Sequence, residues 1–227
     1  MPHEDNPFLG VRGIRHSFRH ESMFRHQLEA IYRVALWQVQ NGSESGIHIM
    51  FPMISRISEW RKAREIAEQV RNEVGAPKLP LGIMVEVPST ALLAEHFAKE
   101  VDFFSIGSND LTQYTLAMDR LHPDLAGEAD SFSPALLKLI SMTVQAADAN
   151  GKWVGVCGNM AADPDLACIL LGLGVKEISV SPANIPALKL LIRSVSYKKL
   201  RDKACKALTL ESSAELRKLY KNRTDLT

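Results

Sequence analysis

Short apolar runs alternate with segments of helical periodicity along the whole sequence, and this alternation limits the possible folds more than any other feature. The runs rich in β-branched and aromatic residues predict strands at 47–52, 81–87, 103–106, 153–157 and 177–180. The segments between them predict helices at 21–39, 58–74, 90–98, 134–150 and 164–171, followed by a terminal helix at 213–221. The strands are apolar without strict alternation, which is typical of parallel strands covered on both faces. The sequence therefore predicts an α/β fold built from successive strand–helix units.

Helix boundaries and apolar stripes support these assignments. Within 58–74, an apolar stripe recurs at the helical period: Trp60, Ala63, Ile66, Ala67 and Val70. Ser133 and Pro134 suit the start of the helix over 134–150, and Asn150 with Gly151 suits its end.

Polar or reactive residues end several of the predicted strands: Glu86, Asn109, Asp110 and Cys157. Ligand sites of parallel α/β folds form at the carboxyl ends of strands, and a barrel gathers these ends into one ring. This favours a TIM-type (β/α)8 barrel over an open doubly wound sheet, although the alternation alone fits both. Only about five or six strands can be read, against the eight of a closed barrel, so we expect an incomplete barrel. No linker or low-complexity segment divides the chain, which predicts a single domain over 1–227.

The charge balance and the cysteines exclude several classes of protein. Lys and Arg number 27 against 26 Asp and Glu, a net charge of +1, which argues against a nucleic-acid partner. The three cysteines form no CxxC pair, which argues against a disulfide framework or structural zinc and fits a reducing compartment. The first residues do not have the order of a signal peptide, and no apolar run is long enough to span a bilayer. We therefore expect a cytoplasmic domain with no membrane insertion.

Two acids stand at successive strand ends. Glu86 closes an apolar strand, and Asp110 follows the next strand along the chain. Each has an ordinary interpretation: Glu86 at a solvated strand end, and Asn109 with Asp110 as a helix N-cap. Together they offer two hard oxygen ligands to one ion, and magnesium typically takes one or two carboxylates with substrate oxygens and water. The pair predicts a Mg²⁺ site.

Arginines supply the side of the site that binds anions. Arg12 lies between two glycines, where little side-chain bulk shields its guanidinium, and Arg120 lies ten positions after Asp110. Planar guanidinium groups suit bidentate recognition of phosphate or carboxylate. The arginines that follow Arg12 are expected on the solvated surface: Arg15, Arg19 and Arg25.

The cysteine at the end of the fourth predicted strand has two interpretations. Small buried cysteines are common core residues, and this is the interpretation for Cys168 on an apolar helix face. Cys157 differs because it shares the ring of strand ends with Glu86 and Asp110. A thiol in that place can act as a general acid if its proton reaches the reacting carbon.

Five motifs occur in an order that resembles the C-terminal domain of Enzyme I, the phosphoenolpyruvate–protein phosphotransferase of the sugar phosphotransferase system: NPFLGVRGIR, IMFPMIS, GIMVEVP, VDFFSIGSNDLTQYTLAMDR and GKWVGVCGN. The runs MDRLHP and GLGVKEISVSP resemble more particularly the Enzyme I module of multiphosphoryl transfer proteins. The resemblance covers nearly the whole chain.

The resemblance implies a (β/α)8 barrel that binds phosphoenolpyruvate and Mg²⁺. It implies transfer of the phosphoryl group to a histidine of a separate N-terminal domain, then to the phosphocarrier protein HPr, with release of pyruvate. A homodimer is implied as well. By motif position, Arg12 and Asn109 would bind the phosphate and Arg120 the phosphate or carboxylate. Glu86 and Asp110 would ligate the metal, and Cys157 would protonate the enolpyruvate carbon.

The sequence departs from the family's pattern in two respects. The family's barrel begins before the first motif, with strands that include a further phosphate-binding arginine motif, and the phosphohistidine domain precedes it. We therefore expect a fragment that lacks the first barrel strands and the phosphohistidine domain, binds phosphoenolpyruvate weakly and does not transfer phosphoryl groups alone. Asn159 stands where the family commonly has an acid, which would weaken a proton relay to Cys157. Two alternatives remain: a fragment of pyruvate phosphate dikinase or phosphoenolpyruvate synthase, and an inert module that only binds phosphoenolpyruvate or a partner.

Overall fold

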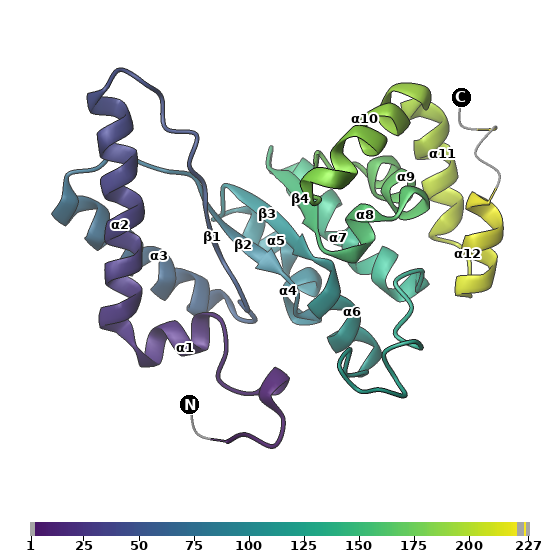
Figure 1. Cartoon of the computed structure of the whole chain (residues 1–227), viewed down its shortest axis with the longest axis horizontal. Coiled ribbons are helices and arrows are strands. Elements are labelled where there is room, and N and C mark those ends of the chain that lie inside the picture. Colours follow the sequence, from purple (N-terminus) through teal and green to yellow (C-terminus); the bar gives the residue numbers. More distant parts are fainter. Residues whose placement is uncertain (1–2, 222–224, 226–227) are drawn as a thin grey trace. The chain divides into compact units, whose positions relative to one another are not determined.

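The computed structural model describes residues 3–221 and 225. The chain divides into two compact units, Met1–Met84 and Val85–Thr227 (Figure 1). Helices and parallel strands alternate in each unit, so the predicted α/β class is confirmed.

The first unit packs helices beside a pair of parallel strands. Its elements are η1 (Pro7–Leu9), α1 (Ile14–Arg19), α2 (Glu21–Gln40), β1 (Ile49–Phe51), α3 (Ile57–Val74) and all but the last residue of β2 (Leu81–Val85). Strand β1 pairs with β2 in parallel, with Ile49 opposite Leu81. Helix α2 packs against α3, whose apolar stripe is buried as predicted.

At the start of α3, the Glu59 carboxylate accepts hydrogen bonds from the backbone N–H of Ser55 at 2.8 Å and of Arg56 at 3.0 Å. These bonds satisfy donors that a helix start leaves open, which fixes where α3 begins.

The second unit continues the alternation of strands and helices. Its elements are α4 (Pro88–Leu92), α5 (Ala94–Ala98), β3 (Phe103–Gly107), α6 (Ser108–Leu116), α7 (Pro134–Ala149), β4 (Trp153–Cys157), α8 (Asn159–Ala162), α9 (Pro164–Leu173), β5 (Glu177–Ile178), η2 (Pro182–Asn184), α10 (Ile185–Ser194), α11 (Tyr197–Ala207) and α12 (Ser213–Tyr220). Strands β3, β4 and β5 pair in parallel. In this register Phe103 lies opposite Trp153, and Gly107 lies opposite Cys157. The carboxyl ends of β3 and β4 therefore lie side by side.

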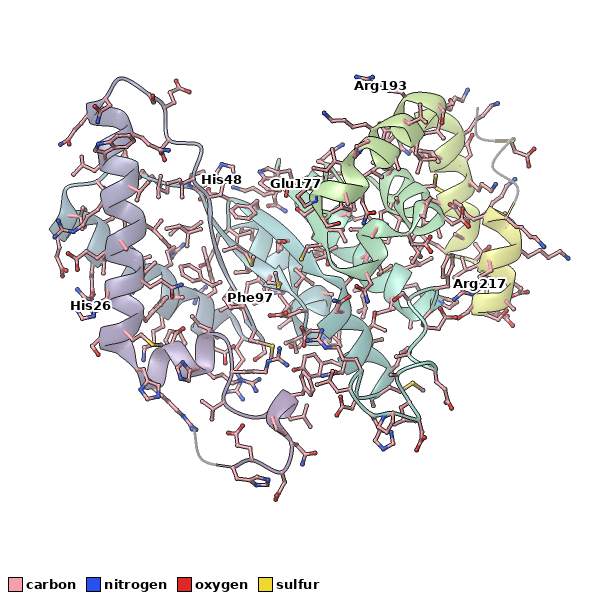
Figure 2. All side chains as sticks on the ribbon, in the orientation of Figure 1. His26, His48, Phe97, Glu177, Arg193 and Arg217 are labelled. Carbon is pink, nitrogen blue, oxygen red and sulfur yellow. The ribbon has the colours of Figure 1, made fainter. Side chains whose placement is uncertain are left out.

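Helices cover the strands of the second unit. Helix α7 contacts β3, β4, α4 and α5, and its apolar residues are buried. Phe97 of α5 is fully buried, whereas Arg193 of α10 is exposed (Figure 2). Helix α9 packs against α11 so closely that a Cβ at Gly172 would lie 2.4 Å from the backbone oxygen of Leu200. Of the helices within residues 3–221, none is both long and apolar enough to cross a membrane.

The predicted elements agree with the structure except in a few places. All five predicted strands form, but β1, β2 and β5 are shorter than expected. The helix predicted over 90–98 is two short helices, α4 and α5, which meet at Leu93. The helices α1, α6, α8, α10 and α11 are not among the predicted segments, because they carry too few residues or too mixed a pattern. That the two units act as one domain over 1–227, and that the strands belong to a barrel, stay predictions.

Candidate active site

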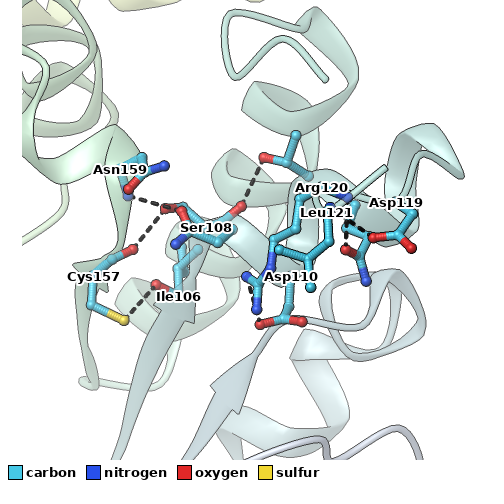
Figure 3. Close-up of polar contacts among 11 residues, drawn as sticks. Ile106, Ser108, Asp110, Asp119, Arg120, Leu121, Cys157 and Asn159 are labelled. Carbon is cyan, nitrogen blue, oxygen red and sulfur yellow. Dashed lines mark hydrogen bonds and ion pairs between the residues drawn. The ribbon is translucent and has the colours of Figure 1, made fainter. Parts of the chain in front are cut away.

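The first turn of α6 carries two of the predicted site residues. Gly107 takes the N-cap position, so Asn109 and Asp110 lie inside the first turn and the interpretation of these two residues as an N-cap is wrong. The Asn109 side chain instead bridges to the next strand end, because its Oδ1 accepts a hydrogen bond of 2.9 Å from the backbone N–H of Asn159 (Figure 3). With Oδ1 engaged, the amide nitrogen of Asn109 is the group left to donate to a ligand.

Arg120 returns to Asp110 because the chain reverses after α6. Ala117 ends the helix in the left-handed conformation, with φ +54°, and the Met118 N–H donates to the backbone oxygen of Gln113. The Gln113 side-chain oxygen then accepts from the Arg120 N–H at 3.1 Å. As a result, Arg120 Nη1 lies 3.2 Å from Asp110 Oδ2 (Figure 3). The side chains are 34% and 13% exposed, so this ion pair is partly shielded from water.

Glu86 follows β2 directly and is 4% exposed. The interpretation as a solvated strand end is therefore wrong. Burial of a carboxylate is costly unless hydrogen bonds, positive charge or a metal compensate it. The burial of Glu86 is in keeping with its predicted role as a ligand, which stays a prediction.

Cys157 is half-buried at the end of β4, and its thiol donates to the backbone oxygen of Ile106 at 3.5 Å. Burial raises the pKa of the Cys157 thiol most, a hydrogen bond with Ser105 opposes this, and the negative charges of Glu86, Glu177 and Asp110 raise the pKa further. The thiol is therefore protonated at neutral pH. Glu86 and Asp110 both act on this one group, which places the two acids and the thiol in a common electrostatic environment.

The other cysteines differ from Cys157. Cys168 is completely buried in α9, which confirms its prediction as a core residue, and Cys205 is exposed on α11. All three are free thiols. Within the part of the chain that the structure describes, no group of three or more His, Cys, Asp or Glu side chains is placed to hold a metal.

Arg12 belongs to the first unit and lies between η1 and α1. Its guanidinium lies over the Phe8 ring, 4.9 Å from the centroid. The following glycine has a packing role, because a Cβ on Gly13 would lie 2.7 Å from Met53 Cβ and the glycine has φ +53°. That Arg12 acts together with the residues of the second unit stays a prediction.

The arginines expected on the surface differ among themselves. Arg19 is exposed as predicted. Arg15 is half-buried and donates to the backbone oxygen of Leu9 at 3.3 Å, and Arg25 is half-buried and forms an ion pair with Glu73.

Ser108 is a site residue that the sequence reasoning missed. It is 1% exposed, and its hydroxyl donates to the backbone oxygen of Cys157 at 2.7 Å (Figure 3). The sequence signal that could have identified Ser108 is its position: it is a small residue with a hydroxyl group, directly between Gly107, which follows the predicted strand, and Asn109.

Comparison with known proteins identifies similar sequences. Residues 1–197 match the family model for the PEP-binding domain of PEP-utilising enzymes. The chain is 52% identical over 219 residues to the multiphosphoryl transfer protein of Rhodobacter capsulatus, an alignment that covers 96% of this chain and 26% of that protein. It is 40% identical over 229 residues to the phosphoenolpyruvate-protein phosphotransferase of Listeria monocytogenes, covering 97% of this chain and 39% of that protein. The chain therefore spans between about a quarter and two-fifths of these relatives.

Solved structures with a similar fold have little sequence identity to this chain. A malate synthase from Haloferax volcanii matches with a TM-score of 0.54 at 18% identity, covering 74% of this chain and 47% of that chain. A citrate lyase from Burkholderia xenovorans matches with a TM-score of 0.51 at 19% identity, covering 77% and 61%. These neighbours are TIM-barrel-like, which supports the predicted fold class. At this identity the likeness concerns the fold alone.

Proposed function

The chain belongs to the PEP-utilising enzymes, through their PEP-binding domain, and on this premise we propose that it binds phosphoenolpyruvate for transfer of the phosphoryl group to a protein histidine. The observation that carries the proposal is the Asp110–Arg120 pair beside a thiol that burial and nearby acids keep protonated. The proposed site would combine a metal ligand, an anion-binding cation and a proton donor, the three groups that this reaction requires.

Mg²⁺ is the proposed cofactor, held by Glu86 and Asp110. The fit rests on the donors: both are hard carboxylates shielded from water, and both act on the Cys157 thiol. Magnesium is commonly bound through one or two carboxylates, with substrate oxygens and water completing its shell, so a two-acid set suffices. When bound, the ion would neutralise charge on the transferring phosphoryl group.

The phosphate and carboxylate of the substrate would be bound by nitrogen donors. Arg120 offers a planar guanidinium, and Asn109 offers the amide nitrogen left by its bond to Asn159. Arg12 of the first unit is the further proposed phosphate ligand. These groups would hold the phosphoryl oxygens while charge redistributes over them.

Cys157 is the proposed proton donor. As the bond from phosphorus to the enol oxygen breaks, the phosphoryl group passes to an imidazole nitrogen, and the oxygen keeps the electron pair and becomes a carbonyl. The methylene carbon then takes the thiol proton, which gives pyruvate and leaves a thiolate that regains a proton from water. The raised pKa of Cys157 supports this role because the thiol enters the reaction protonated. Asn159 cannot relay a proton as an acid would, so reprotonation of Cys157 is expected to be slow.

The relatives' names support a place in a phosphotransferase chain, rather than a fragment of pyruvate phosphate dikinase. The proposed partners are therefore a phosphohistidine domain, the phosphocarrier protein HPr beyond it, and a second copy of the chain in a homodimer. The proposed location is the cytoplasm, in keeping with three free thiols.

Calorimetric titration of the chain with phosphoenolpyruvate, with and without Mg²⁺, tests the proposal. Binding is expected to require Mg²⁺, to be abolished by a chelator, and to weaken at least about tenfold in Asp110→Asn. The matched control is Asp202→Asn, which changes an exposed acid of α11 and is expected to leave binding unchanged. A folded chain that binds no phosphoenolpyruvate at any Mg²⁺ concentration would contradict the proposal.

A further inference from the structure

The turn that follows Cys157 is held by side chains of a different element. Gly158 leaves β4 with φ +95°, a conformation that favours glycine, and α8 begins at the next residue. A Cβ at Gly158 would lie 2.4 Å from Ser108 Oγ and 2.9 Å from Asn109 Oδ1. The turn therefore lies directly against the first turn of α6.

Two consecutive side chains of α6 bind the backbone on either side of Gly158. Ser108 Oγ donates to the Cys157 oxygen at 2.7 Å, and Asn109 Oδ1 accepts from the Asn159 N–H at 2.9 Å (Figure 3). Ser108 is in turn held in its helix, since Thr112 Oγ1 donates to its backbone oxygen at 2.7 Å. Ser108 is 1% exposed, so little water competes for the bonds that its hydroxyl and its backbone oxygen make.

We infer that Ser108 is a positioning residue, whose bond to the Cys157 carbonyl fixes the proton-donating thiol relative to the first turn of α6. This inference rests on the proposed function. The first turn also carries Asn109 and Asp110, so the bond joins the phosphate and metal ligands to the proton donor in one rigid group. A misplacement of about 1 Å can lower a rate about a hundredfold. A hydrogen bond that holds the thiol in place is therefore important for proton transfer to a carbon atom.

The test measures how fast the Cys157 thiol is alkylated by iodoacetamide in the chain without ligand, by mass spectrometry of the peptide that contains it. Peptide analysis separates Cys157 from Cys205, which is exposed, and Cys168, which is buried. Ser108→Ala is expected to raise the Cys157 rate about fivefold, which corresponds to about 1 kcal/mol, the usual contribution of one hydrogen bond. Ser108→Thr keeps the hydroxyl and is expected to stay within about twofold of the unaltered chain.

Ser141→Ala is the matched control. Ser141 is a buried serine of α7, and its hydroxyl accepts a hydrogen bond from Gln145 of the same helix rather than bonding to the Cys157 turn. Equal Cys157 alkylation rates in Ser108→Ala and Ser141→Ala would overturn the inference, because loss of any buried serine hydroxyl would then have the same effect on the thiol. Equal rates in Ser108→Ala and Ser108→Thr would overturn it as well.

A second variant approaches the same contact from the other side. Gly158→Ala places a Cβ against Ser108 Oγ and is expected to raise the alkylation rate as Ser108→Ala does, so the inference stays testable if one variant does not fold. An unchanged rate in the folded variant would refute it. Addition of phosphoenolpyruvate and Mg²⁺ then separates the two proposals. If the Cys157 alkylation rate depends on Ser108 but phosphoenolpyruvate and Mg²⁺ do not slow it, the positioning role is sustained and the proposed function is contradicted.

Discussion

Replacement of Arg120 by alanine tests the proposed anion-binding role of this residue most directly. Arg120 is 34% exposed and holds Asp110 at 3.2 Å through one guanidinium nitrogen. Its other nitrogens extend the same planar fork, which suits bidentate recognition of phosphate or carboxylate. Arg120→Ala removes the proposed ligand of phosphoenolpyruvate and also the positive charge beside a carboxylate that is 13% exposed.

The expected loss follows from the bonds that the substrate would make. A hydrogen bond to a charged group contributes about 1.5–3 kcal/mol, and about 1.4 kcal/mol corresponds to a tenfold change in affinity. Arg120→Ala should therefore weaken phosphoenolpyruvate binding about 10- to 100-fold. Arg120→Lys keeps the positive charge but not the planar fork of donors. Its affinity for phosphoenolpyruvate should lie between that of the unaltered chain and that of Arg120→Ala. Without the guanidinium, the proposed metal ligand Asp110 should attract Mg²⁺ more strongly, so the comparison requires saturating Mg²⁺.

The assay is calorimetric titration of each variant with phosphoenolpyruvate, with thermal unfolding as a check of the fold. Arg33→Ala is the matched control, because Arg33 forms an exposed ion pair with Glu29 on α2 and its side chain is 70% exposed. Its removal should leave affinity within about twofold, since exposed pairs contribute about 0–1 kcal/mol. The reasoning is refuted if folded Arg120→Ala binds phosphoenolpyruvate as tightly as Arg33→Ala does.

Three further predictions concern charge, packing and the terminal helix. Glu86→Gln removes a negative charge that raises the pKa of Cys157, so the absorbance of the Cys157 thiolate should develop at lower pH than in the unaltered chain. An unchanged or raised pKa would contradict an electrostatic effect of Glu86 on Cys157. Gly172→Ala should lower the free energy of unfolding in urea by about 1–3 kcal/mol, because its Cβ would lie 2.4 Å from a backbone oxygen of α11; the stabilisation usual for this change within a helix would contradict the packing. Arg217→Ala removes an ion pair of α12 and a contact of the guanidinium 4.1 Å above the Phe132 ring, and it should cost about 0.5–1 kcal/mol in the same assay, whereas no loss would make the contact incidental.

The sequence by itself determined the order and type of the main elements. Strands β2, β3 and β4 were recognisable because both of their faces are apolar, and α3 because its apolar residues recur at the helical period. These signals are local, since each depends only on residues close together in the chain. The same local patterns set Cys157 at a strand end and Glu86 and Asp110 shortly after strand ends, which is why the sequence alone singles them out as candidate site residues.

Only the tertiary structure decided how these residues relate to one another. The bond from Asn159 to Asn109 joins positions 50 residues apart, and it depends on the register that sets β4 beside β3. The return of Arg120 to Asp110 depends on Ala117 at positive φ. This conformation is uncommon for alanine, so the sequence does not predict it. The burial of Glu86 and the raised pKa of Cys157 likewise depend on elements distant in sequence. Periodicity encodes which face of an element is apolar, but packing between elements sets distance, burial and charge, and these decide which strand-end residues form a site.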